Sequence, residues 1–276
     1  MTSVNTNIAG LTAQNHMKNV NRDMEKTMER LSTGKKINSA GDNAAGLAIS
    51  SRMTSQIRGL DAAIRNANDA ISMVNTAEGA LDEITNMLQR MRELAVQAGT
   101  GTTASADRTY LNSEFVALRS EIDRIADNTK WNGRNILDGS AGASTGASTV
   151  AFQIGQDGVK TQTLSTSFGN FNNTTGKLSG LASKVITGTT ITSAVNMASK
   201  SITEIDVVIG DVSSQRATFG AVSNRLTHAV DNLTNVKTNS EAARSRILDT
   251  DYAAATSELS RTQIIQQAAT AMLAQA

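Results

Sequence analysis

The sequence contains no cysteine and no proline, and aromatic residues make up only 3% of its 276 residues. Without cysteine, disulfide bonds and thiolate metal sites are excluded. Proline breaks helices, because it lacks a backbone N–H and its ring clashes with the preceding turn. Its absence therefore favours long, unbroken helices, in a chain long enough to form one or two domains with a sizeable core.

The sequence also lacks an excess of charge and a long apolar segment. Net charge is +1 at neutral pH, and basic residues are interspersed with acidic ones, which is typical of a solvated surface and excludes a nucleic-acid-binding patch. No run reaches the roughly 18 apolar residues that a membrane span requires. The first ten residues lack the basic and apolar regions of a signal peptide, so we expect any export to occur without a cleaved leader.

Two amphipathic patterns lie at the ends of the chain. Apolar residues at spacings of three and four predict a helix over residues 3–32 and another over 245–276. The first stripe consists of Val4, Ile8, Leu11, Ala13, Met17, Val20, Met24, Met28 and Leu31. The second consists of Ile247, Leu248, Tyr252, Leu259, Ile265, Ala269 and Met272. Short isolated helices are marginal in water, so both stripes need a partner.

Two longer segments, 44–98 and 190–236, show the heptad repeat of coiled-coil helices. In the first, one row consists of Met53, Leu60, Ala67, Val74, Leu81, Leu88 and Ala95. A companion row consists of Ile57, Ile64 and Ile71, slips at Glu78 as in a coiled-coil stutter, and resumes at Ile84 and Met91. The second segment has the row Ala198, Ile205, Val212, Phe219, Leu226 and Leu233. A helix over 44–98 would be about 80 Å long, so other helices must cover it.

Shorter elements are predicted between the two long helices. Glycines in 99–107 indicate a helix end, followed by a Ser or Thr cap for the next helix. The apolar stripe of that next helix consists of Leu111, Phe115, Leu118, Ile122 and Ile125. Asn132-Gly133 indicates a turn, and residues 169–180 form a loop. Alternating apolar residues followed by Asp157-Gly158 predict a β-hairpin near 148–166.

The fold class predicted from these patterns is mostly α, a long antiparallel helical bundle or coiled coil with a small β-hairpin region. The order of the elements is nearly palindromic: terminal helix, long helix, small centre, long helix, terminal helix. The two ends of the chain are therefore expected to lie side by side.

Few residues are placed for chemistry. Gly41 and Gly46 have the spacing of a phosphate loop, but no strand precedes them and Leu47-Ala48 stand where Lys and Ser or Thr are required, so a connector with a capped helix start is favoured. The histidines, His16 and His228, lie on separate predicted helices and do not indicate a metal site. Asp249 and Asp251 do not converge on one helix face. No catalytic, cofactor-binding or metal-binding residue is predicted, and an enzyme is not expected.

Several motifs along the chain, in a consistent order, resemble those of one known protein family. They are SVNTNIAGLTAQ, RLSTGKKINSAGDNAAGLAIS, IRGLDAAIRNANDAISMVNTAEGALDEI, NMLQRMRELAVQA, KWNGRNILDG, GAVSNRL, AARSRILDTDYA and AATAMLAQA. The resemblance covers residues 2–139 and 195–276, and leaves a middle too short for a full outer domain. The chain is thus similar to a minimal flagellin that lacks large outer domains.

The resemblance implies a structural subunit that self-assembles into the extracellular flagellar filament for motility. Terminal helices over 1–32 and 245–276 would line an inner tube, linkers over 33–46 and 237–244 would act as spokes, and 47–236 would form a rod-like shell. We expect subunit assembly to depend on the apolar residues Val4, Ile8, Leu11, Val20, Leu31, Leu259, Ile265 and Met272.

The resemblance also implies partners: further copies of the chain, a flagellar export chaperone, and hook-associated and cap proteins. The segment LQRMRELAVQA is similar to the flagellin surface that an animal Toll-like receptor binds. The matching residues are Gln89, Arg90 and Leu94, with Glu114 on the neighbouring helix. Because Leu88, Met91 and Ala95 belong to the buried stripe, Arg90 is expected to point outward. The alternative is that Arg90 and Glu114 are ordinary solvated residues, or that they make axial contacts between subunits of the filament.

Two other classes of function stay open at this point. A secreted coiled-coil effector or adhesin would use the same helices to bind host proteins, and would stay soluble where a filament subunit polymerises on seeds. An enzyme would need a convergent site, which the sequence does not offer.

Overall fold

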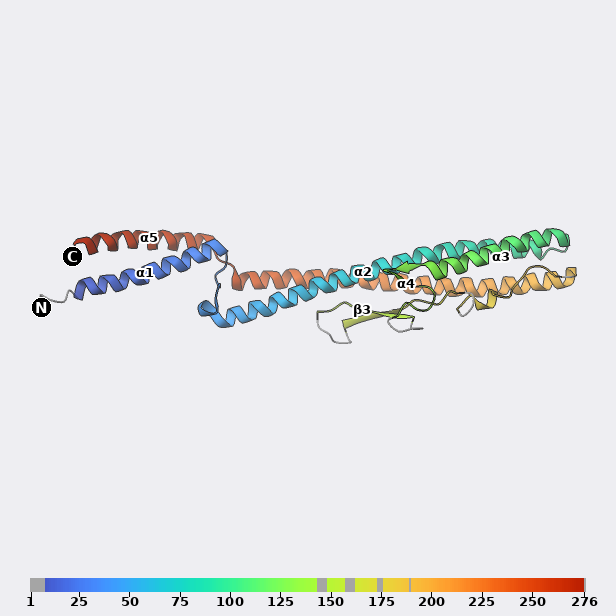
Figure 1. The fold of residues 1–276 in the computed structure, drawn as a ribbon, viewed down its shortest axis with the longest axis horizontal. Helices are drawn as coiled ribbons and strands as arrows, with labels where there is room; N and C mark the ends of the chain where they lie inside the picture. Colours follow the sequence, from blue (N-terminus) through green and yellow to red (C-terminus); the bar gives the residue numbers. More distant parts are fainter. Residues whose placement is uncertain (1–7, 143–147, 157–161, 173–175, 189, 276) are drawn as a thin grey trace. The chain divides into compact units, whose positions relative to one another are not determined.

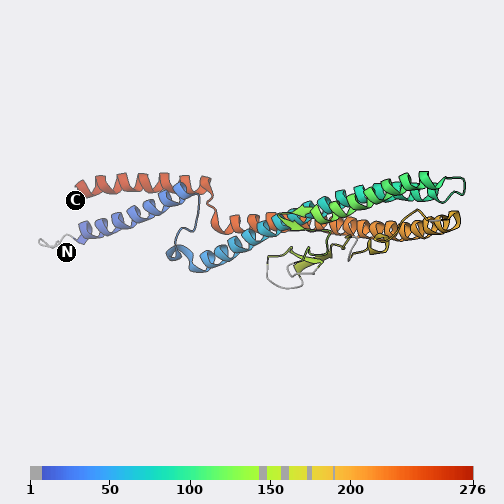
Figure 2. The same cartoon turned by 45° about the vertical axis from the view of Figure 1, so that its right-hand side comes forward.

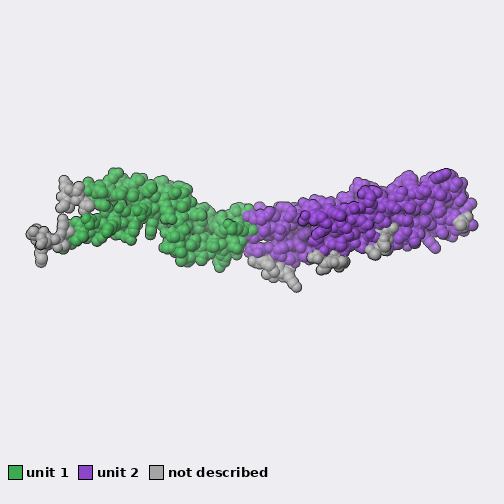
Figure 3. Space-filling view, viewed as in Figure 1, with its two compact units in different colours: residues 1–58, 235–276 green, residues 59–234 purple. Residues whose placement is uncertain are grey.

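The computed structural model describes residues 8–142, 148–156, 162–172, 176–188 and 190–275. The chain divides into two compact units: unit 1 contains residues 1–58 and 235–276, and unit 2 contains residues 59–234 (Figure 3). Both boundaries fall within long helices, described below.

Unit 1 is built on an antiparallel pair of terminal helices. Helix α1 (Ile8–Thr33) and helix α5 (Tyr252–Gln275) lie side by side (Figures 1 and 2). The amide Nε2 of Gln266 donates a hydrogen bond across the pair to Oδ1 of Asn21, at 2.9 Å. The predicted proximity of the two ends of the chain is thus confirmed for the described residues of these helices.

Unit 2 is a helical bundle that confirms the predicted fold class. Helices α2 (Ala40–Ala98), α3 (Ser105–Asn128) and α4 (Ile191–Leu248) run alongside one another in it (Figures 1 and 2). The heptad row of α2 from Leu60 to Ala95 is buried, as is the α4 row from Ala198 to Leu226. Apolar residues on one face of α3 complete the core, among them the fully buried Phe115 and Ile122.

The slip in the α2 pattern coincides with a change from apolar to ionic contacts. Glu78 interrupts the companion row and is only partly buried. Arg216 on α4 reaches both Glu78, at 4.0 Å, and Asp82, at 3.1 Å. Ala77, Leu81 and Ile84 are buried around this point, so the seam shifts to the neighbouring row without a gap in the core.

Two small antiparallel hairpins extend the bundle. Strands β1 (Lys130–Trp131) and β2 (Arg134–Asn135) flank Asn132-Gly133, whose φ angles of 49° and 77° fit the two left-handed positions of a type I′ turn. Strands β3 (Thr149–Gln153) and β4 (Thr163–Ser167) form the hairpin that alternation predicted, and Phe152 pairs with Leu164. The expected Asp157-Gly158 turn lies outside the described residues.

The irregular segment after β4 packs into the core. Phe168 and Phe171 are fully buried, and the Phe168 ring lies 5.1 Å from that of Phe219 on α4. Gln215 on α4 donates a hydrogen bond to the Ser167 carbonyl oxygen at 2.7 Å. A short 3₁₀ helix, η2 (Ser179–Leu181), follows. Arg119 on α3 donates to the carbonyl oxygens of Leu181, Ala182 and Lys184, which ties this segment to the bundle.

An arginine closes the turn between α2 and α3. The predicted Ser or Thr cap is wrong: Ala104 precedes α3 and provides no side-chain cap. Instead Arg108, only 2% exposed, donates Nε–H to the Ala98 carbonyl oxygen at 3.0 Å and Nη2–H to that of Thr100 at 2.7 Å. The Ala98 carbonyl group ends α2 and has no later helical N–H to bind, so the guanidinium replaces it, and the Thr100 carbonyl group, just after the helix, accepts both Arg108 and the Thr103 N–H.

We predict that Arg108→Ala lowers the free energy of unfolding by about 1–3 kcal/mol, because two carbonyl groups lose their buried donor. Urea denaturation followed by circular dichroism measures this change. Arg124→Ala on the same helix is the matched control: Arg124 is exposed and pairs with Glu121, so its loss should cost at most ~1 kcal/mol. Equal effects of the two substitutions would contradict the capping role of Arg108.

Candidate assembly surfaces and their linkers

The first linker begins at a glycine that ends α1. Gly34 has a φ of +69°, and its N–H donates to the Arg30 carbonyl oxygen at 2.9 Å. A Cβ atom at this position would lie 3.0 Å from the hydroxyl oxygen of Tyr252, the first residue of α5. Both the left-handed backbone and this close approach favour glycine.

A backbone bridge joins this linker to the junction between α4 and α5. The Thr250 N–H donates to the Gly34 carbonyl oxygen at 3.0 Å, and the Lys36 N–H donates to that of Leu248 at 2.6 Å. Lys35 and Asp249 are the paired residues between them. The first linker and the α4–α5 junction are thus held together by main-chain hydrogen bonds, which do not depend on side-chain identity.

Two consecutive caps start α2. Asp42 in its first turn accepts hydrogen bonds from the N–H groups of Ser39, at 3.0 Å, and Asn38, at 3.2 Å. These bonds, that from Ser39 first, hold the pKa of Asp42 below its usual value. The helix is then interrupted at Asn43, whose φ of −163° and ψ of 96° are not helical. Its Oδ1 accepts from the Gly46 N–H at 2.8 Å, which caps the remainder of the helix.

Gly46 has a packing role. Its backbone lies against the buried side chain of Ile37, and an added Cβ atom would come within 2.6 Å of Ile37 Cδ1. The sequence interpretation of a connector with a capped helix start is consistent with this contact and with the Asn43 cap. The glycine spacing that resembles a phosphate loop thus has a structural cause.

The predicted return linker, 237–244, is wrong, because these residues are helical and belong to α4. Lys237 pairs with Glu241 one turn on, at 3.9 Å, and Arg244 reaches the Thr54 hydroxyl at 3.4 Å. The break falls instead at 249–251, so the last helix begins at Tyr252 and not at 245. Asp251 provides the cap by accepting from the N–H of Ala253 at 2.9 Å.

The most deeply buried residues of the contact between α1 and α5 are small or polar. Thr27 on α1, and Ala255 and Thr262 on α5, are the buried residues of this pair. Both threonine hydroxyls donate to carbonyl oxygens of their own helices, so they offer no bond across the pair. The apolar area that holds the two helices together within one chain is therefore small.

Larger apolar side chains of the same two helices face outward. Ile8, Leu11, Met28, Ile264, Ile265 and Met272 are exposed, with Met272 72% exposed. Of the residues expected to act in assembly, Ile8, Leu11, Ile265 and Met272 are among these exposed side chains. Val20, Leu31 and Leu259 are partly buried, and Val4 lies outside the described residues.

The residues expected to bind a host receptor lie on α2 and α3. Gln89, Arg90 and Glu114 are exposed, and Arg90 pairs with Glu114 at 2.8 Å and with Glu93 at 3.1 Å. Leu94 departs from the expectation, because it is only 1% exposed and belongs to the core. It therefore cannot serve as an exposed apolar anchor beside Arg90.

No chemical centre competes with these surfaces. Across the described ranges, no three His, Cys, Asp or Glu side chains gather as a possible metal site. His16 and His228 are exposed, on α1 and α4. Asp249 and Asp251 lie at the junction between helices rather than on one, and Asp249 accepts from the Ser245 hydroxyl at 2.6 Å.

Comparisons with known families identify this helical pattern. A profile of the bacterial flagellin N-terminal helical region matches residues 4–142, and one of the bacterial flagellin C-terminal helical region matches residues 202–276. The chain belongs to the bacterial flagellin family. The two matches leave out 143–201, the short middle of this flagellin.

Similar proteins agree over almost the whole length. Flagellin A of Vibrio cholerae serotype O1 is 36% identical over 364 positions, which cover 99% of this chain and 96% of the relative. Polar flagellin F of Vibrio parahaemolyticus serotype O3:K6 is 35% identical over 362 positions, with the same coverage. Both alignments exceed the 276 residues of this chain, so these relatives carry segments that it lacks. It is a minimal flagellin without large outer domains.

Solved structures of flagellar proteins match parts of this chain. A Bacillus cereus flagellin is 33% identical and covers 65% of this chain and 94% of its own, with a TM-score of 0.48. A structure described as a putative flagellar hook-associated protein from Vibrio parahaemolyticus covers 75% of this chain and 100% of its own. Its TM-score is 0.61 at 14% identity, so this second likeness is one of fold.

Family membership decides between the functions left open by the sequence. Flagellins are structural subunits of the flagellar filament, so this chain is a structural protein and not an enzyme. The filament subunit is likewise favoured over the coiled-coil effector or adhesin. In the parts of the chain that the structure describes, no helix has the length and apolarity to cross a membrane.

We predict that Gly46→Ala lowers the free energy of unfolding by about 1–3 kcal/mol, because the new methyl group overpacks the contact with Ile37. Gly79→Ala on the same helix is the matched control. No atom lies within 4 Å of a Cβ at Gly79, so alanine should stabilise that helix by about 0.5–1 kcal/mol. Urea denaturation measures both, and a Gly46→Ala variant as stable as the wild type would show that Ile37 can yield.

Proposed function

We propose that this flagellin polymerises through the outward faces of its paired terminal helices, α1 and α5. The observation that carries the proposal is the large apolar surface that this pair leaves exposed. Large apolar residues between the helices, such as Val20 and Leu259, are only partly buried. Ile8, Leu11 and Ile264 face solvent. Each large apolar side chain gains about 1.5–3 kcal/mol when fully buried, so contact with other copies would stabilise these faces.

The same faces explain why assembly would continue into a filament. Distinct surfaces on one subunit that bind each other head to tail form an open helical polymer if the rotation does not close. We further propose that the filament is extracellular, and that the subunit pairs with an export chaperone and with hook-associated and cap proteins.

We predict that Ile264→Gln raises the critical concentration for seeded polymerisation at least about tenfold, because one large apolar contact is lost per interface. Sedimentation of filaments grown on wild-type seeds measures it. Gln263→Asn, at an exposed polar position next to Ile264, is the control and should polymerise as the wild type does. Unchanged polymerisation of Ile264→Gln, at wild-type helicity, would remove α5 from the interface.

A second proposed function is recognition of the monomer by an animal Toll-like receptor. It rests on Gln89, Arg90 and Glu114, three exposed polar residues on two adjacent helices. The side chain of Arg90 is half exposed and is already oriented by Glu114, so little ordering would be needed on binding. Arginine is a frequent hot-spot residue in interfaces.

We predict that Arg90→Ala weakens receptor binding by more than about 1 kcal/mol, the hot-spot threshold, with little loss of stability because its ion pairs are exposed. Surface plasmon resonance on monomeric protein measures the affinity. Arg92→Ala is the matched control: Arg92 lies two residues away and pairs with Asp206 on α4 at 2.7 Å. Equal affinity of Arg90→Ala and wild type would exclude this surface.

A further inference from the structure

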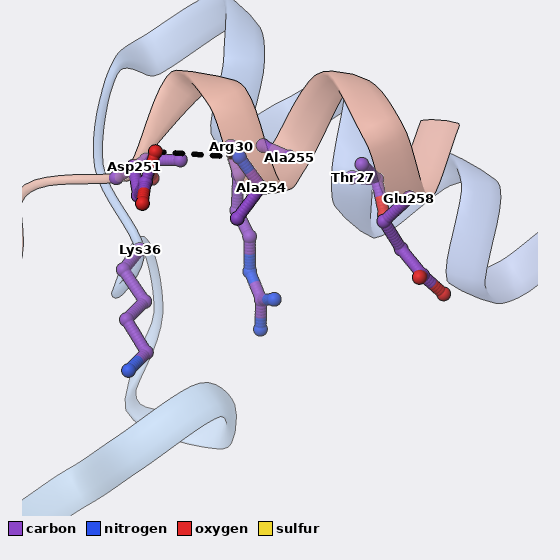
Figure 4. A pocket seen from close by; sticks show the side chains of 8 residues that line it. Thr27, Arg30, Lys36, Asp251, Ala254, Ala255 and Glu258 are labelled. Carbon is purple, nitrogen blue, oxygen red and sulfur yellow. Dashed lines mark hydrogen bonds between the residues drawn. The ribbon is translucent and has the colours of Figure 1, made fainter. Parts of the chain in front are cut away.

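A pocket in unit 1 lies at the start of α5, against α1 and the first linker (Figure 4). Its volume is about 350 Å³. Thr27 and Arg30 come from α1, Lys36 from the linker, and Thr250 and Asp251 from the α4–α5 junction. Ala254, Ala255 and Glu258 of α5 complete the lining. The two alanine side chains are short, so space is left between the charged groups.

The acidic groups of this pocket already have partners. Asp251 Oδ1 accepts hydrogen bonds from the N–H groups of Ala253 and Ala254, and so caps α5. Glu258 pairs with Arg261 one turn on, at 3.2 Å. Neither carboxylate forms a salt bridge with the pocket cations in the described part of the chain.

The basic groups of the pocket are left without a carboxylate partner. Within the described residues, neither Arg30 nor Lys36 takes part in a salt bridge or donates a side-chain hydrogen bond. Arg30 is the smallest of the causes that lower the pKa of Asp42, and hydrogen bonds from Ser39 and Asn38 have larger effects. The Thr250 hydroxyl, also in the lining, is buried and has no hydrogen-bond partner. Two cations without a carboxylate partner therefore lie beside the two alanine side chains, which suits a carboxylate carried on an apolar support.

The outer face of α1 presents such a group. Glu25, Met28 and Glu29 are exposed, and their spacing of three and four residues places them on one helix face. Glu25 and Glu29 form no salt bridge within the described ranges. Met28 is a large apolar side chain flanked by two carboxylates, and it matches a pocket with an alanine floor flanked by two cations.

We infer that the Glu25–Met28–Glu29 face of one copy docks into the Arg30–Lys36 pocket of a second copy. This inference rests on the proposed assembly through the terminal helices, and names one contact within it. The carboxylates would pair with Arg30 and Lys36 while Met28 covers Ala254 and Ala255. Because the docking face and the pocket are different surfaces of one chain, the contact is heterologous and can repeat along a filament.

The test is a charge exchange between two variants. Variant A carries Arg30→Glu and Lys36→Glu, and variant B carries Glu25→Lys and Glu29→Lys. Each variant alone places like charges at every contact. In a mixture, the acidic pocket of A can pair with the basic face of B, and the basic pocket of B can pair with the acidic face of A. Seeded elongation, followed by light scattering and electron microscopy, should fall at least about tenfold for either variant alone, and should recover in the mixture.

The recovery separates loss of the contact from loss of folding, because a misfolded variant would not be rescued by its partner. A control variant with Lys35→Glu and Arg58→Glu reverses two exposed cations of unit 1 outside this pocket, and should elongate as the wild type does. Elongation of A or B at the wild-type rate, or failure of the mixture to recover, would overturn the inference.

Two further outcomes are distinguishable. Failure of the wild type to elongate on seeds would overturn the proposed assembly itself, independently of the variants. If inorganic phosphate binds the wild-type monomer by calorimetry, binding is lost in A, and A still elongates normally, the pocket holds a small anion and the docking contact is overturned.

Discussion

The apolar seam of α2 is the constraint on which the rest of unit 2 depends. Most of the stability of a helix in a protein comes from packing of its apolar face, and the buried positions of α2 continue from Leu60 to Ala98. The helices α3 and α4 and the segment after β4 each cover part of that row. Where a polar residue enters the seam, at Glu78, an arginine of α4 meets it. Unit 2 of this flagellin is therefore specified by continuous burial, with charges placed at its margin.

Unit 1 follows a different rule. Between α1 and α5 the buried groups are Thr27, Ala255 and Thr262. The large apolar residues of the two helices are either partly buried or exposed. What holds unit 1 in register is local and polar: the main-chain bridge from Gly34–Lys36 to Leu248–Thr250 and the caps at Asp42 and Asp251. Such hydrogen bonds fix the direction of the chain at these points but bury little apolar area. A unit built this way is positioned by its own chain and leaves apolar surface exposed, which is the surface that we propose other copies cover.

The sequence predicted most of the fold because heptad and alternating patterns are periodic. The long helices, the β3–β4 hairpin and the Asn132-Gly133 turn were all found in this way. The return linker was missed because Thr, Asn and Ser at 238–240 have low helix propensity. Tertiary context overrides them: Ser240 and Ile247 continue the row of Leu226 and Leu233 and are half buried. The Asp-Thr-Asp stretch at 249–251 holds the signal that could have located the break, since Asp is a preferred cap.

The site residues were harder to predict, because they depend on how many neighbours a helix has. A two-row heptad leaves Leu94 at the edge of the buried stripe, but α2 meets both α3 and α4 near its end, so Leu94, Ala95 and Ala98 are all buried. The buried Arg108 reverses the usual expectation for an arginine, since its role comes from carbonyl groups at the end of another helix. The charges of unit 1 show the same limit. Arg30 and Glu29 are adjacent in sequence, yet one lines a pocket and the other faces solvent. Consecutive helix positions lie on different faces, so a chain can carry both halves of a head-to-tail contact on one helix without the halves meeting.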